Sequence, residues 1–270
     1  MMVVIRRIIS SIAEKIPMSI LFISISIVLV IVVIVAISIH VHNKSKAGKR
    51  KKKVQRIRSG FGDSSYRSEI LNSLPAEQRL DFSNLYHRLD ELQSFINQNK
   101  IQLESLESQK ISDIEKKIQD FTNQIRNQWN CLKNKRDFHH CICIHYASFT
   151  LADSIKRQQE NIRDVYVKYK EECDQLARQI DFLNRQIANS NGQKKYEYMQ
   201  QHKVCCTRHQ RLSTLKNVFA DRNTQYLQRV KEQNAYTKQC REYIIRNFGE
   251  RGRIWGERLK QRKADLIGNS

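Results

Sequence analysis

Apolar residues recur along most of this chain in alternating steps of three and four, a spacing typical of coiled-coil helices. The first run slips in phase after Leu106 and then resumes with the same spacing. Its apolar positions are Phe82, Leu85, Leu89, Leu92, Ile96, Leu103, Leu106, Ile114, Ile118, Phe121, Ile125 and Trp129. The pattern predicts one helix over residues 76–133, with Pro75 in its first turn, where a missing N–H is tolerated.

Two further runs follow with the same spacing. The second comprises Leu151, Ile155, Ile162, Tyr166, Tyr169, Cys173, Leu176, Ile180, Leu183 and Ile187, and the third Leu212, Leu215, Phe219, Tyr226, Val230, Cys240 and Ile244. They predict helices over 138–189 and 193–247, joined through the turn residues Asn191 and Gly192. Helices of similar length with short connections favour antiparallel neighbours. Residues 73–248 are therefore expected to form an elongated antiparallel coiled-coil or three-helix bundle. The alternative is a parallel dimer of the first helix followed by a helical hairpin.

The scarcity of chain breakers supports an all-α fold. The chain of 270 residues has only 8 Gly and 2 Pro, and residues 76–191 contain neither. A β or α/β domain would need turn residues every dozen positions or so. Long helices are the structures that need few turns.

A long apolar segment lies near the N-terminus. Residues 16–42 carry no Asp, Glu, Lys or Arg, and the 22 residues from Met18 to Ile39 would span roughly 33 Å as a helix. This length matches the hydrocarbon core of a bilayer and exceeds the apolar region of a secretory signal. We therefore expect a transmembrane helix over 18–40 after a short tail, 1–17.

The net charge of +21 is concentrated after this segment. Residues 44–58 carry +9, residues 59–130 carry −3 and residues 131–270 carry +13. The segment 41–72 is expected to be a polybasic juxtamembrane stretch and linker that contacts anionic lipid headgroups. The residues expected at the membrane surface are Lys49, Arg50, Lys51, Lys52, Lys53, Arg56 and Arg58.

The same cluster predicts the orientation. Lysine and arginine near a membrane span favour the cytoplasmic side, so we expect a single-pass protein with its N-terminus outside and its body in the cytoplasm. The chain has 7 cysteines, an odd number that suits a reducing compartment.

The last segment, 249–270, combines basic and apolar residues and is expected to form a basic amphipathic tail. Such a helix can lie on a membrane, enter a partner's groove or contact phosphates, with an indole available to stack on a base. The alternative is an extra helix packed on the end of the bundle. The candidate partner or phosphate contacts are Arg251, Arg253, Trp255, Arg258 and Arg262.

The stretch "HHCICIH", residues 139–145, is a candidate metal site. On a helix His139 pairs with Cys143 and Cys141 pairs with His145, and the two pairs point to nearly opposite sides. One zinc ion would therefore need ligands from neighbouring helices. The expected antiparallel packing would bring other cysteines to the same end. The candidate zinc ligands are Cys131, Cys141, Cys143, Cys240 and His145. The alternative, that these cysteines are apolar core residues, has the larger weight.

A second group, "HKVCCTRH", contains His202, Cys205, Cys206 and His209. No nucleotide-binding, nucleophile-elbow or zinc-protease motif is present, so an enzyme is not expected. We expect a membrane-anchored coiled-coil scaffold or tether that binds a protein partner or itself. A membrane-tethered nucleic-acid-binding protein that uses the basic half is the first alternative, and a zinc or thiol sensor is the second.

Overall fold

The computed structural model describes residues 64–100, 108–135 and 137–268. All helices below lie in one compact unit, residues 61–264, except for the last four residues of α8. The helices are α3 (Ser64–Asn72), α4 (Ala76–Gln98), α5 (Ser108–Lys135), α6 (Phe138–Ala188), α7 (Gly192–Asn247) and α8 (Gly249–Gly268). These ranges contain no strand, and the all-α prediction is confirmed.

Within the described ranges, no helix combines the length and the apolar character needed to cross a membrane. The predicted tail 1–17, the predicted span 18–40 and the basic residues 49–58 lie outside the described residues.

The prediction of one helix over 76–133 is wrong. Two helices, α4 and α5, occupy this stretch, and Asn99 ends α4 with its side-chain amide donating to the Phe95 carbonyl (2.8 Å). The two helices run antiparallel, because Phe95 faces Lys117 and Arg88 faces Phe121. The phase slip after Leu106 falls between α4 and α5, at residues 101–107, which lie outside the described residues.

The long hairpin of α6 and α7 agrees with the predicted ranges. The two helices are antiparallel, with Ser148 and Thr237 hydroxyls 2.7 Å apart and Gln159 bonded to Asn223 at 2.9 Å. Gly192 follows the turn with φ 61, a left-handed conformation that glycine adopts without strain. Asp137 caps the start of α6 by accepting from the His140 backbone N–H (3.0 Å).

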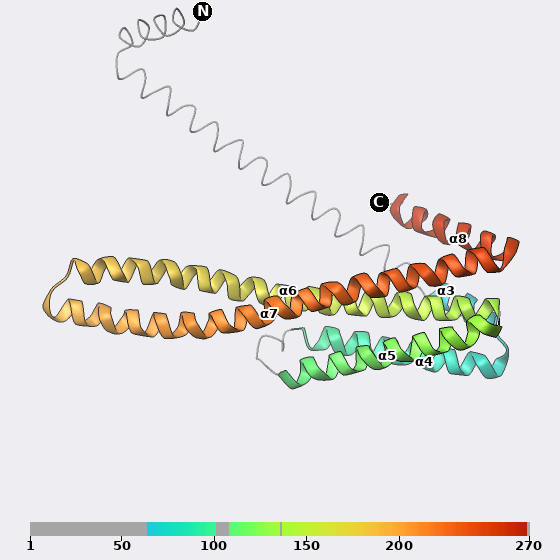
Figure 1. The fold of residues 1–270 in the computed structure, drawn as a ribbon, viewed down its shortest axis with the longest axis horizontal. Coiled ribbons are helices and arrows are strands. Elements are labelled where there is room, and N and C mark those ends of the chain that lie inside the picture. Colours follow the sequence, from blue (N-terminus) through green and yellow to red (C-terminus); the bar gives the residue numbers. More distant parts are fainter. Residues whose placement is uncertain (1–63, 101–107, 136, 269–270) are drawn as a thin grey trace, which may run out of the picture. The chain divides into compact units, whose positions relative to one another are not determined.

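Helices α4 and α5 both pack on the first half of α6. Tyr86 of α4 donates to the Cys143 carbonyl, and Asn161 of α6 donates to the Ile96 carbonyl. The expected three equal helices are thus replaced by a short hairpin, α4 and α5, beside a long one, α6 and α7 (Figure 1). The core between them includes Leu89, Ile114, Ile125, Leu151 and Phe219.

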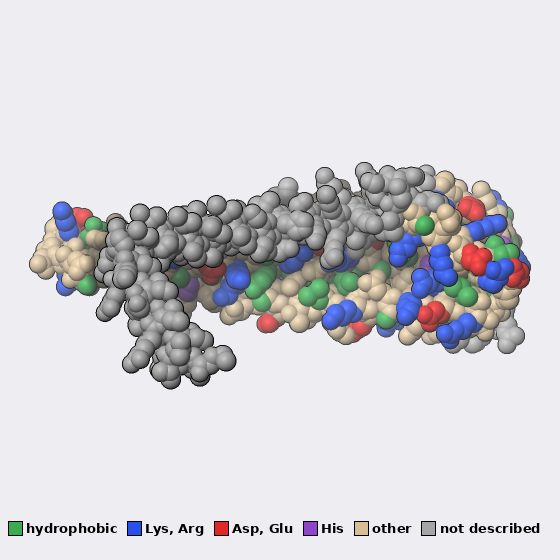
Figure 2. All heavy atoms as spheres, turned by 90° about the horizontal axis from the view of Figure 1, so that it is seen from above, with side chains coloured by type: hydrophobic (Ala, Val, Ile, Leu, Met, Phe, Trp, Pro, Cys, Tyr) green, Lys and Arg blue, Asp and Glu red, His purple; other side chains and the backbone are tan. Residues whose placement is uncertain are grey.

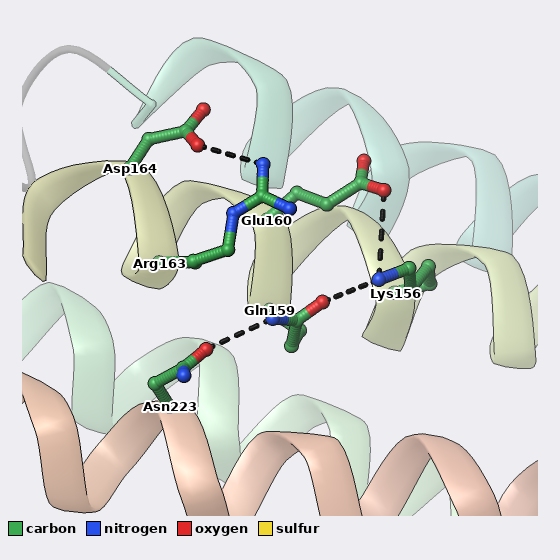
Figure 3. A network of polar contacts seen from close by, with 6 residues as sticks. All are labelled: Lys156, Gln159, Glu160, Arg163, Asp164 and Asn223. Atoms are coloured by element: carbon green, nitrogen blue, oxygen red, sulfur yellow. Dashed lines mark hydrogen bonds and ion pairs between the residues drawn. The ribbon is translucent and has the colours of Figure 1, made fainter. Parts of the chain in front are cut away.

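Polar residues are also buried between α6 and its neighbours. Gln159 is almost fully buried and connects Lys156 to Asn223 across the hairpin (Figure 3). A second polar group joins Ser148 to Gln233 and Thr237. Because a register shift would leave these groups without partners, they help to specify how α6 and α7 align.

The hairpin continues beyond the ends of α4 and α5 (Figure 1). We call this part, residues 170–215, the distal arm. Its separate small core consists of Leu176, Leu183 and Cys205, with Ile180, Tyr198 and Leu212 packed around it. The distal arm is therefore a two-helix coiled coil with far less buried apolar surface than the rest of the unit.

Candidate functional site

The cysteines of the first candidate site lie in the core. Cys141, Cys143 and Cys240 are buried at the end of the bundle where α6 begins and α7 ends. Burial raises the pKa of each thiol to about 12. A thiol with such a pKa is almost entirely protonated at neutral pH and is a poor nucleophile and metal ligand.

The predicted zinc ligands are not assembled. Cys131 is exposed on α5, whereas Cys141, Cys143 and Cys240 are buried. His145 packs edge-on against Trp255 with ring centroids 5.1 Å apart. Burial, and then the nearby Arg241, lowers the pKa of His145 to about 3, so the ring is neutral. In the part of the chain that the structure describes, no three His, Cys, Asp or Glu residues could hold a metal ion together. The physical reason is that the end of the bundle is filled by aromatic rings.

The second Cys/His group is divided as well. Cys205 is buried in the core of the distal arm, whereas Cys206 is half-buried beside His202, with sulfur and ring nitrogen 3.6 Å apart. This is one weak pair on one helix. It provides two of the four ligands that a structural zinc site requires.

Helix α8 is docked on the bundle, which alters the interpretation of its basic residues. Trp255 has only 8% of its surface exposed, and Leu259 is buried beside it. Gly252 and Gly256 lie against the end of α7, where an added Cβ would meet the Ile244 carbonyl or the Ile245 side chain within 3 Å. The expectation that Trp255 is free to stack on a base is wrong, because its ring fills the space beside His145.

Three of the four arginines predicted to contact a partner are held within the chain. Arg251 bonds His139 (3.0 Å) and covers the Phe138 ring. Arg253 pairs with Glu250 and Glu257. Arg262 covers the Tyr66 ring, with its guanidinium carbon 4.4 Å from the ring centroid. The fourth predicted contact, Arg258, has an exposed side chain. It makes no such interaction with the described residues.

The distal arm also presents an accessible surface. It exposes four large apolar side chains, among them Val204 (67%) and Phe182 (55%). The others on the arm are Tyr196 and Met199. Exposed apolar residues on a thin helical hairpin are candidates for contact with a partner.

The charge of the hairpin is asymmetric. Helix α6 contains seven Lys or Arg and seven Asp or Glu, so its net charge is zero. Helix α7 contains twelve Lys or Arg and four Asp or Glu, so its net charge is +8. On the face shown in Figure 2, Lys and Arg side chains appear along the length of the described helices. Much of the positive charge of residues 131–270 is therefore carried by α7, a concentration that the sequence pattern alone did not assign to one helix.

Comparison with protein-family models, with curated proteins and with solved structures found no match for this chain.

Proposed function

We propose that this chain is a single-pass membrane protein whose helical body acts as a scaffold or tether on the cytoplasmic side. The observation that carries the proposal is the distal arm, a two-helix rod that extends past α4 and α5 and exposes Phe182 and Val204. A rod of this kind provides surface for a protein partner or a second copy. Catalysis is not part of the proposal.

The membrane attachment comes from the sequence. The uncharged stretch 18–40 has the length of a bilayer span, and the basic residues of segment 49–58 follow shortly after it. These cations would lie at anionic headgroups and keep the body on the cytoplasmic side.

The alternatives have less support. A nucleic-acid-binding role for α8 would use Trp255, which is buried, and Arg251, Arg253 and Arg262, which have partners within the chain. A zinc or thiol sensor would need accessible thiolates, whereas the pKa values of Cys141, Cys143 and Cys240 are raised to about 12.

Membrane attachment is tested by alkaline carbonate extraction of cells that express the full-length chain. The intact chain should stay in the membrane pellet, and deletion of residues 18–40 should release it. A reporter that functions only in the cytoplasm should be active when it is fused after Ser270. Release of the intact chain by carbonate, or a reporter on the outer side, would contradict the proposed topology.

The role of the distal arm is tested by proximity labelling with F182S/V204S. Both side chains are exposed, so the substitutions leave the core intact. The matched control is L80S, at an equally exposed leucine on α4. We expect F182S/V204S to change the set of labelled neighbours and L80S to preserve it. The same neighbours for wild type and F182S/V204S would contradict the role of the arm.

A further inference from the structure

An exposed line of residues runs along α7 with a spacing of seven. The buried residues Cys205, Phe219, Tyr226, Gln233 and Cys240 also follow multiples of seven, so the helix keeps a constant face towards α6. Residues seven apart therefore share a face along the whole helix. The exposed line consists of Tyr196, Lys203, Gln210, Asn217, Thr224, Lys231 and Lys238.

A second line lies three residues further along, on the adjacent surface. It consists of Met199, Cys206, Ser213, Ala220, Leu227, Asn234 and Arg241. We call the two lines together the α7 strip. The strip contains four cations and no Asp or Glu, although α7 has four carboxylates elsewhere.

The cations of the strip are accessible. Lys203 and Lys231 are exposed, and neither makes an ion pair with a described carboxylate. Lys238 is 3.7 Å from Glu242 but remains largely exposed. Helix α5 contacts a different side of α7, where Trp129 packs on Tyr243.

Apolar side chains accompany these cations. Tyr196, Met199 and Leu227 are exposed on the same strip. From Lys203 to Lys238 the helix rises about 52 Å, so the surface is long and narrow. Lysine heads at phosphate level beside apolar side chains are the arrangement that surface-bound amphipathic helices use on membranes.

We propose that the α7 strip is a second membrane-contact surface, which binds the anionic face of a bilayer. The choice of lipid as occupant rests on the proposed membrane attachment of the chain. Three of the four cations are lysines, which act as point charges towards headgroups, whereas base recognition favours arginine forks and stacking rings. Tyr196 is the one aromatic residue of the strip, and the indole of Trp255 is buried.

The test uses the full-length chain in phosphatidylcholine nanodiscs, mixed with acceptor vesicles that contain phosphatidylserine. The test variant is K203Q/K231Q. The matched control is R178Q/R185Q, which removes two exposed cations from α6 that also lack ion pairs among the described residues. Loss of two surface cations should weaken acceptor binding about 30-fold, or about 2 kcal/mol. The control should bind the acceptor vesicles within about threefold of wild type.

Equal binding by wild type and K203Q/K231Q would overturn the proposal, as would an equal loss in R178Q/R185Q. If the wild-type chain binds duplex DNA but not vesicles, and K203Q/K231Q abolishes the DNA binding, the strip is a nucleic-acid contact instead. A further variant, with all five residues of segment 49–53 changed to Gln, distinguishes lipid binding by the α7 strip from lipid binding by the juxtamembrane segment. If only that variant loses vesicle binding, the strip proposal fails while the proposed juxtamembrane contact stands.

Discussion

His145 should make the stability of the bundle depend on pH. The ring is neutral in the folded chain because burial, followed by the charge of Arg241, lowers its pKa from 6.5 to about 3. Below pH 6.5 the unfolded chain binds a proton at His145 and the folded chain does not, so stability falls as the pH falls and the loss continues to the folded pKa. At pH 5 the expected loss is at most about 2 kcal/mol, at about 1.4 kcal/mol for each pH unit. His145 as a whole residue is only half-buried, which moderates this value.

The assay is urea unfolding of the full-length chain at pH 7 and pH 5, followed by far-ultraviolet circular dichroism. The H145Q variant should lose clearly less stability than wild type between the two pH values, because it has no imidazole to protonate. The control is H87Q, at an exposed histidine on α4 that pairs with Glu91. If wild type and H145Q lose the same free energy of unfolding, His145 is protonated in the folded state and the argument is refuted.

Two further predictions concern the same end of the bundle. W255A removes the ring that docks α8. Amide hydrogen exchange over residues 249–264 should therefore accelerate, and the bundle should lose about 3 kcal/mol of stability. Unchanged protection of α8 would show that its docking does not depend on this ring. Maleimide at pH 8 should label exposed Cys131 quickly and label Cys141, Cys143 and Cys240 only after unfolding, since a pKa of about 12 leaves about one thiolate in 10,000. Mass spectrometry reads both rates, and labelling of the three buried thiols as fast as Cys131 would contradict their place in the core.

Helical periodicity predicts the elements of this fold better than it predicts their arrangement. The ranges 138–189 and 193–247 nearly coincide with α6 and α7, because each carries one mostly apolar buried face along its length. The break between α4 and α5 has no Gly or Pro to mark it, and a phase slip also occurs within continuous coiled coils. Sequence spacing alone therefore could not distinguish one long helix from a hairpin.

The candidate sites were harder to predict because they depend on packing. Cys141 and Cys240 do come to the same end of the bundle, as an antiparallel hairpin requires. The groups that surround Cys141 and Cys240, metal ligands or aromatic rings, depend on where α8 packs. The pattern of basic residues on α8 does not predict where Trp255 docks. The α7 strip could have been found from its seven-residue spacing, once the orientation of α7 relative to α6 was known.

The contact of Arg262 with Tyr66 joins the beginning and the end of the folded unit. A pulling force applied to the chain before α3 would load this contact early. The Tyr66 ring is buried, and a partly desolvated cation–π pair contributes on the order of 1–2 kcal/mol. Helices α3 and α8 would then separate while the core between α6 and α7 remained intact. The fold thus has a mechanically soft closure at one end, which can yield under tension before the long hairpin does.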